Sequence, residues 1–120
     1  MSYIIWGIVG LIILYFIMQM MPVKGVENIT ATQLKTMIRD KNIQFIDVRT
    51  PMEFNQYHIK PFKNMPLQAL RRECEKLDKN KAVVIICRSG SRSLRAARIL
   101  KREGFSQLTN VIGGLNHWQG

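Results

Sequence analysis

The first segment of the chain lacks charge. Residues 3–21 contain no Asp, Glu, Lys or Arg, and a helix needs about 20 mostly apolar residues to cross a bilayer. Residues 1–3 also lack the basic residues of a secretory signal, and residues 19–22 lack the small residues of a cleavage site. These absences exclude a cleaved signal peptide, and the absence of any polar face disfavours a buried core helix. We therefore predict a transmembrane anchor helix over residues 1–22, ended by Pro22.

Acidic residues are scarce in the remainder. The chain has 8 Asp and Glu against 18 Lys and Arg, which gives a formal net charge of +10. Positive residues close to a span tend to stay in the cytoplasm, so we expect a single-pass protein of the cell membrane with its N-terminus outside and its domain cytoplasmic. The expected lipid contact is the bilayer around residues 3–21, where anionic headgroups would attract the basic domain. Nucleic acid is not an expected partner, because no aromatic-basic platform or recognition-helix pattern occurs.

Cysteine is also rare. Cys74 and Cys87 are the two cysteines, and a cytoplasmic location disfavours a disulfide between them. They do not form a Cys-x-x-Cys pair, and His58 and His117 do not complete a zinc-binding pattern. We therefore expect no metal and no cofactor. Cys74 shares a predicted helix face with Leu70, which favours a buried structural thiol.

Helical and strand patterns alternate after a linker over residues 23–28. Thr30 and Gln33 have the spacing of a capping box at the start of a helix, and Ala82–Cys87 is an apolar run typical of a central strand covered on both faces. We predict further strands over 43–48 and 108–111, and helices over 30–40, from Pro51, over 67–77 and over 91–103. This alternation predicts one α/β domain over residues 29–120, with a small, mainly parallel sheet flanked by helices on both faces.

Cys87 stands where the strongest strand ends and a helix is about to begin. Backbone N–H groups in such a turn, together with the helix N-terminus, favour negative charge, and they therefore favour the reactive thiolate over the thiol. Cys87 is the candidate nucleophile. The candidate substrate-binding loop that follows it contains Arg88, Ser89, Gly90, Ser91 and Arg92.

A second predicted strand ends in Asp47-Val48-Arg49. Ligands of parallel sheets bind outside the carboxyl ends of the strands, which places this segment beside the Cys87 loop. We expect Asp47 to hold Arg92 or the loop backbone, and Arg49 to pair with Glu53. Both would support the site without taking part in the chemistry.

These motifs, in this order, resemble those of the single-domain rhodaneses, which are sulfurtransferases. The resemblance covers about residues 25–120. It departs from the family at Tyr57, where a Gly is usual, and at residues 60–63, which replace a Pro-Gly-Ala type of turn. The matching segments are 46–49, 53–54, 58–59, 64–67, 84–93 and 113–118.

The resemblance implies a sulfur relay. The Cys87 thiolate would take a sulfane sulfur from a small donor such as thiosulfate or a persulfide, and a thiol or another thiophilic acceptor would then remove it. A protein partner is also conceivable on this pattern, without any indication of its identity. The interpretation requires that the Cys87 sulfur can be reached from solvent.

Two alternatives belong to other functional classes. Cysteine phosphatases and arsenate reductases of this fold resemble Cys-x5-Arg, whereas Cys87 and Arg92 have the spacing Cys-x4-Arg, and the shorter ring fits one sulfur better than a tetrahedral phosphate. A non-catalytic rhodanese-like module that binds a partner or senses sulfur at the membrane is the second alternative.

Overall fold

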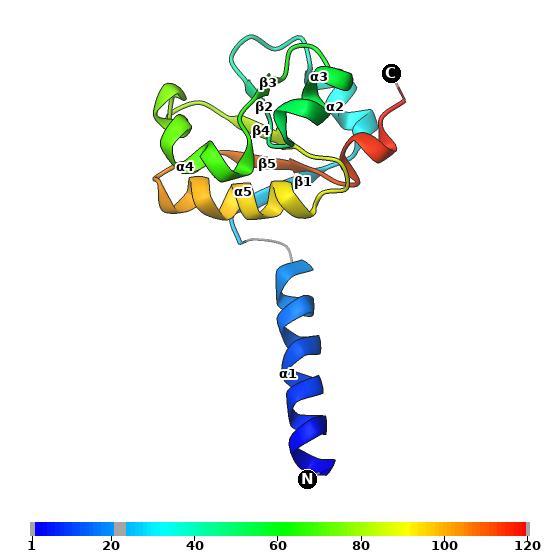
Figure 1. The fold of residues 1–120 in the computed structure, drawn as a ribbon. Helices are drawn as coiled ribbons and strands as arrows, with labels where there is room; N and C mark the ends of the chain where they lie inside the picture. The colour runs from blue at the N-terminus through cyan, green and yellow to red at the C-terminus, as the bar shows by residue number, and fades with distance from the viewer. Residues whose placement is uncertain (1, 21–23, 120) are drawn as a thin grey trace.

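A five-stranded parallel sheet forms the centre of the domain (Figure 1). The computed structural model describes residues 2–20 and 24–119. The sheet has the order β1-β5-β4-β2-β3, and each neighbouring pair is parallel. The predicted α/β fold with a parallel sheet is confirmed. The strands are β1 (Val26–Ile29), β2 (Gln44–Asp47), β3 (Lys63–Asn64), β4 (Val83–Ile86) and β5 (Leu108–Val111).

Helices cover both faces of the sheet, and the pleat of β4 separates two cores. Val83 and Ile85 face a core closed by α4 and α5, and Val84 and Ile86 face a second core that includes Leu34 of α2. This alternation is why an apolar run without polar interruptions is required in the central strand. The helices of the domain are α2 (Ala31–Met37), α3 (Pro51–Gln56), α4 (Leu70–Glu73) and α5 (Ser91–Arg102), with short 3₁₀ turns η1 (Leu67–Ala69), η2 (Cys74–Lys76) and η3 (Gly114–His117).

Two capping boxes fix the starts of the short helices. Thr30 caps α2 with Gln33 as its reciprocal partner, as predicted, and Thr50 caps α3 in the same way with Glu53. Each box satisfies N–H groups that have no partner within the helix. The second box also fixes where Glu53 lies, which becomes important at the site.

The structure corrects two sequence predictions. Residues 26–28, assigned to a linker, belong to β1, which pairs with β5 along its whole length. The helix predicted over residues 67–77 is divided into η1, α4 and η2. At its two ends, i→i+3 hydrogen bonds replace the α-helical pattern, from Ala69 N–H to the Pro66 carbonyl and from Leu77 N–H to the Cys74 carbonyl.

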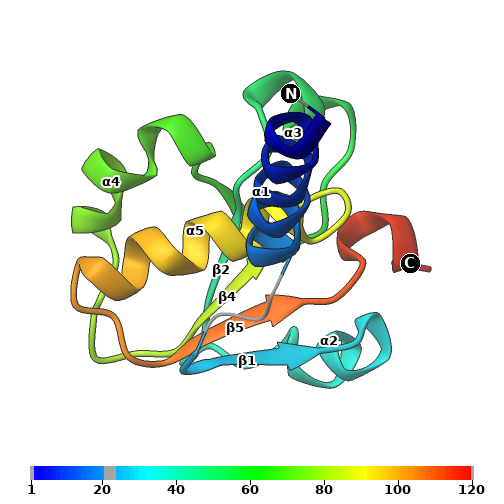
Figure 2. The same cartoon turned by 90° about the horizontal axis from the view of Figure 1, so that it is seen from below.

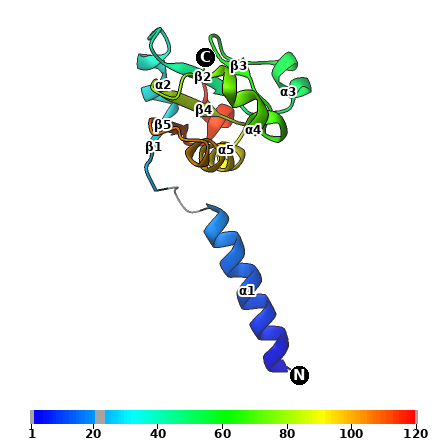
Figure 3. The same ribbon diagram turned by 90° about the vertical axis from the view of Figure 1, so that its left-hand side faces the viewer.

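The N-terminal helix α1 (Ser2–Met20) projects from the domain on the side of α5 (Figures 1 and 3). In the view from below in Figure 2, α1 points toward the viewer in front of one end of α5, which it contacts. Its apolar side chains are exposed, for example Leu11 at 68% and Phe16 at 60%. The guanidinium of Arg98 on α5 donates a hydrogen bond to the Met18 carbonyl at 3.1 Å.

The predicted transmembrane helix is not supported. Among the described residues, no helix combines the length and the apolarity needed to cross a membrane. The predicted end of the anchor at Pro22 and the predicted start of the linker at Val23 lie outside the described residues.

Candidate active site

The Cys87 sulfur is held by backbone N–H groups. Cys87 follows β4 directly, at the carboxyl edge of the sheet. The N–H of Gly90 donates to Sγ at 2.9 Å and the N–H of Ser93, in the first turn of α5, donates at 3.3 Å. Both donors favour negative charge on the sulfur, and the N-terminus of α5 adds partial positive charge in the same place. The predicted loop 87–92 therefore closes around a single sulfur atom.

Gly90 makes this closure possible. It stands directly before α5 with φ +106°, a conformation that side-chain-bearing residues rarely adopt. The positive φ therefore explains why glycine suits this position, from which the backbone N–H points at the sulfur.

A buried polar network continues from the sulfur into the sheet. The Ser93 hydroxyl lies 3.4 Å from Cys87 Sγ, donates to the Gly90 carbonyl at 2.9 Å, and contacts the side-chain oxygen of Asn110 on β5. Asn110 in turn donates to Asn28 on β1 at 3.1 Å. A hydroxyl has one proton to donate, and the Gly90 carbonyl and the Asn110 side chain both lie within its reach. The network connects the Cys87 sulfur to β1 and β5.

The two arginines of the loop meet one carboxylate. Arg92 forms a bidentate pair with Glu53 of α3, at 2.7 and 3.0 Å, and the more exposed Arg88 places its Nε 3.8 Å from the same carboxylate. The hydrogen bonds from Arg92 are the main reason that the pKa of Glu53 is lowered from 4.5 to about 2. Arg92 is thus committed to Glu53, whereas the side chain of Arg88, 63% exposed, remains open to an anionic substrate.

Asp47 and Arg49 pair with each other, and neither predicted pairing of theirs forms. Arg49 Nε lies 3.0 and 3.1 Å from the two carboxylate oxygens of Asp47, and Nη2 lies 2.8 Å from Oδ2. The residues are two positions apart at the end of β2 and both are buried, so the local pair satisfies both charges without a distant partner. Arg49 also donates to the Tyr57 carbonyl at 2.6 Å. The pair therefore fixes the chain after α3 rather than the Cys87 loop.

The start of η3 forms hydrogen bonds with the backbone carbonyls of the Cys87 loop. Leu115 N–H donates to the Cys87 carbonyl at 2.9 Å, and Asn116 N–H donates to the Arg88 carbonyl at 3.0 Å. Gly114 has φ +54°, and a Cβ there would lie 2.2 Å from the Cys87 carbonyl oxygen. The Gly-Gly segment is therefore part of the site, because only a glycine allows this approach.

Access to the sulfur is closed. Cys87 is 0% exposed, although the sequence interpretation requires a reachable thiol. Arg88 and Ser89 above it are exposed, and a cavity of about 520 Å³ borders the loop at Ser89, Gly90 and Ser91. Since the sulfur is fully covered, a reaction at Sγ requires a rearrangement of the residues that cover it.

The second thiol lies in an unreactive setting. Cys74 is buried beside α4 and donates to the Arg71 carbonyl at 3.3 Å. Burial, with a smaller contribution from Glu103, raises the pKa of the Cys74 thiol, which disfavours its thiolate. Within residues 2–20 and 24–119, no group of His, Cys, Asp and Glu side chains is arranged to hold a metal ion.

Sequence reasoning missed three residues of the site. Ser93 and Asn110 are separated by 17 positions and meet only through the packing of α5 on β5. Glu53 was expected to pair with Arg49, and it binds Arg92, 39 positions away. One signal for Glu53 was present, since its capping box with Thr50 fixes its place at the start of α3.

Comparisons with known proteins agree on one family. The family model described as "Rhodanese-like domain" matches residues 30–120. The chain is 31% identical over 94 residues to a protein named sulfurtransferase from Allochromatium vinosum, covering 78% of this chain and 88% of that one. It is 36% identical over 81 residues to Bacillus subtilis YrkF, covering 68% of this chain but only 44% of that relative.

The fold has solved counterparts. The crystal structure of a rhodanese-like domain protein from Staphylococcus aureus superimposes with a TM-score of 0.71 at 30% identity. The match covers 78% of this chain and 91% of that structure. The similarity therefore extends over nearly the whole of that structure.

Glu53 predicts an acid sensitivity. A carboxylate whose pKa is lowered on folding stabilises the fold above its unfolded value and loses this contribution as pH falls from 4.5 to about 2. Between pH 4.5 and about 2, the free energy of unfolding of the wild type should fall. We expect the fall to be smaller in Glu53→Gln, by about 1 to 3 kcal/mol. Denaturant unfolding at several pH values measures this. Glu75→Gln, which removes an exposed carboxylate, is the control, and an equal change in both variants would contradict the role of the Arg92 pair.

Ser93 predicts a change in sulfur reactivity. Ser93→Ala removes the hydroxyl beside the sulfur but retains the backbone N–H, and we expect alkylation of Cys87 by iodoacetamide at neutral pH to slow by about three- to tenfold. Peptide mass spectrometry follows the rate at each cysteine, and Cys74 should react far more slowly than Cys87. Ser91→Ala, in the same loop and exposed, is the control. Equal rates in the wild type and the Ser93 variant would show that the hydroxyl does not affect the sulfur.

Proposed function

The chain belongs to the family of rhodanese-like domains, and from this membership we propose that it is a sulfurtransferase that works through a persulfide on Cys87. The observation that carries the proposal is the pair of N–H groups, from Gly90 and Ser93, directed at the Cys87 sulfur. Such donors stabilise a thiolate before the reaction and a charged sulfur chain after it. No other described thiol has this arrangement, because Cys74 is buried without N–H donors to its sulfur.

The proposed first half-reaction loads the cysteine. The thiolate of Cys87 attacks the outer sulfur of thiosulfate, or the sulfane sulfur of a persulfide, and a new S–S bond forms. The donor's own S–S bond breaks, and sulfite or a thiolate leaves with the electron pair. Cys87 then carries one additional, negatively charged sulfur. The exposed guanidinium of Arg88 is placed to attract an anionic donor.

The second half-reaction unloads it. A nucleophilic acceptor, such as a thiolate or cyanide, attacks the terminal sulfur of the persulfide. The bond between that sulfur and Cys87 Sγ breaks, and the Cys87 thiolate is restored with its electron pair. The two steps need no external oxidant or reductant, since the donor's leaving group and the acceptor account for all electrons. The small ring of backbone around Sγ fits this chemistry better than the transfer of a tetrahedral phosphate or arsenate.

One observation favours a second function. Because Cys87 is fully covered, a non-catalytic module that binds a partner or senses sulfur would also account for the structure. The two functions differ in what Cys87→Ser removes: a binding module retains its partner without the thiol, whereas a sulfurtransferase loses turnover.

We further propose that α1 attaches the domain to the cell membrane, with the domain on the cytoplasmic side. Support comes from the exposed apolar side chains around α1, since such a surface is stable only when an apolar environment covers it. The cationic excess of the rest of the chain favours a location beside an anionic lipid leaflet. The identity of the sulfur donor and the membrane attachment are independent parts of the proposal.

The persulfide can be tested directly. Incubation of the full-length protein with thiosulfate should add the mass of one sulfur atom to the peptide that contains Cys87, and cyanide should remove it. We expect Cys87→Ser to lose the adduct and all turnover, and Cys74→Ser to retain both. No adduct with thiosulfate or with a small persulfide donor would reject the sulfurtransferase and leave the binding module.

The attachment can be tested with lipid vesicles. We expect the full-length protein to float with vesicles that contain phosphatidylglycerol, because burying the α1 side chains in lipid is favoured by about 25 cal/mol per Å² of apolar surface. Replacing the exposed pair Leu11 and Phe16 by Asp should reduce flotation strongly, and Met52→Asp, an exposed apolar change in α3, should not. Recovery of the wild type in the vesicle-free fraction would contradict membrane attachment.

A further inference from the structure

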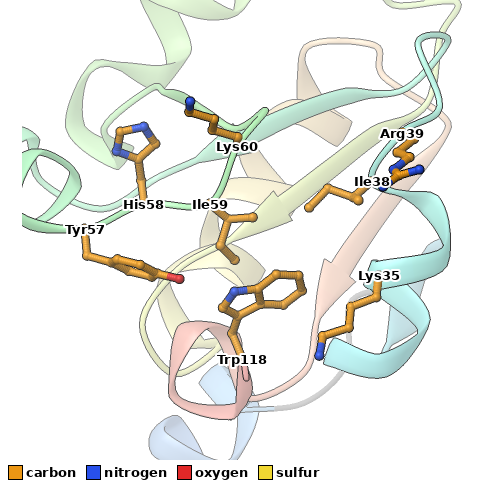
Figure 4. A pocket seen from close by; sticks show the side chains of 8 residues that line it. All are labelled: Lys35, Ile38, Arg39, Tyr57, His58, Ile59, Lys60 and Trp118. Atoms are coloured by element: carbon orange, nitrogen blue, oxygen red, sulfur yellow. The ribbon is translucent and has the colours of Figure 1, made fainter. Parts of the chain in front are cut away.

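A cationic cavity that none of residues 87–92 lines takes no part in the proposed sulfur chemistry. Its volume is about 630 Å³, and it opens between α2, residues 57–60 and Trp118 (Figure 4). Lys35 and Arg39 contribute from the α2 side, and Lys60 lies across the cavity from them. No Asp or Glu lines it.

The charges of this cavity are available to a ligand. Lys35, Arg39 and Lys60 are exposed, and none of them belongs to an ion pair within the described part of the chain. The Lys35 ammonium donates to the Gln119 carbonyl at 2.5 Å and lies 5.4 Å from the centre of the Trp118 ring. These contacts hold the ammonium at the cavity wall while leaving its charge without a counterion.

Aromatic surfaces complete the cavity. Tyr57 is 55% exposed, and its ring points toward Trp118, which is half-buried (Figure 4). Exposed Tyr and Trp rings and Arg side chains are enriched where proteins bind one another, and the lysines add unpaired positive charge beside them.

Both walls of the cavity are connected to the Cys87 loop. Trp118 follows η3, whose Leu115 N–H donates to the Cys87 carbonyl at 2.9 Å. Tyr57 follows α3, whose Glu53 holds Arg92 of the loop, and its carbonyl accepts from Arg49 at 2.6 Å. A molecule bound in the cavity therefore lies next to the elements that shape the site.

We propose that this cavity binds an acidic segment of the protein that receives sulfur from Cys87. The sulfur step rests on the function proposed above, whereas the binding does not. The cations are separated, exposed and placed around an open cavity, so they suit several carboxylates spread along a peptide. A small free anion would need donors that converge on one point, and the cavity offers none that is buried. The partner's cysteine would then attack the terminal sulfur, the bond to Cys87 Sγ would break, and the partner would leave as the persulfide.

Trp118 provides a direct reading of binding. The chain has two tryptophans, so Trp6→Phe in the full-length protein, kept in a neutral detergent, leaves Trp118 as the only indole. The probe is a short blocked peptide with a cysteine flanked by Asp and Glu residues, and the reference peptide carries Asn and Gln in their place. We expect the acidic peptide alone to change the Trp118 fluorescence at low salt, and the change to disappear at high salt.

Charge-neutral variants locate the site. The Lys35→Gln/Lys60→Gln double variant should weaken binding of the acidic peptide by about tenfold. Lys79→Gln/Lys81→Gln removes the same charge from two exposed positions outside the cavity and should weaken it by less than about twofold. Circular dichroism verifies that both variants are folded. Equal losses in the two double variants would overturn the proposal, because they would reflect net charge alone.

Rates of sulfur transfer test whether binding in the cavity promotes transfer from Cys87. After Cys87 has been loaded from thiosulfate, the ratio of transfer rates to the acidic and neutral peptides should exceed one in the wild type and fall by about tenfold in the Lys35/Lys60 variant. If loading fails while the acidic peptide still binds at Trp118, the sulfurtransferase is rejected and the binding site is retained. Equal affinity for the acidic and neutral peptides, or fluorescence changes with sulfate or ATP but not with the acidic peptide, would overturn the acidic-segment site.

Discussion

The site depends on the contact between the Cys87 loop and the glycine turn that follows β5. Leu115 and Asn116 donate their N–H groups to the carbonyls of Cys87 and Arg88. The two segments approach so closely that there is no room for a side chain at Gly114. These hydrogen bonds fix the carbonyls of Cys87 and Arg88, while the N–H groups of Gly90 and Ser93 point at the sulfur. Two segments that are distant in sequence therefore form one cradle, and the chemistry proposed for Cys87 depends on that geometry.

Electrostatics divides the surroundings of the cradle into two separate units. The buried Asp47–Arg49 pair satisfies its charges at the end of β2 and holds the segment after α3. The Glu53–Arg92 pair joins the start of α3 to the start of α5. Arg88 shares Glu53 with Arg92 at the longer distance of 3.8 Å, and its side chain is 63% exposed. Under the proposed function, the exposed positive charge that could attract a donor therefore belongs to Arg88, while Arg49 and Arg92 hold the structure together.

Local patterns in the sequence predicted most of the fold. The apolar run of β4, the capping box at Thr30 and the periodicity of α5 each depend on neighbours close in sequence, and they were placed correctly. Contacts set by tertiary packing were not predictable in this way. β1 is a four-residue strand that is recognisable only beside β5, and the partner of Glu53 is decided by how α3 and α5 approach each other. The burial of Cys87 also depends on tertiary packing and was not predicted.

The cradle also separates two tasks that many binding sites combine. Sulfur is contacted by main-chain N–H groups of Gly90 and Ser93, while the side chains of Arg88, Ser89 and Ser91 point away from that contact at the exposed surface. Main-chain N–H groups are retained whatever side chains Arg88, Ser89 and Ser91 are replaced by. Under the proposed function, evolution or a protein engineer could therefore change these three outer side chains to alter which molecule is admitted, while the contacts to the sulfur stay the same.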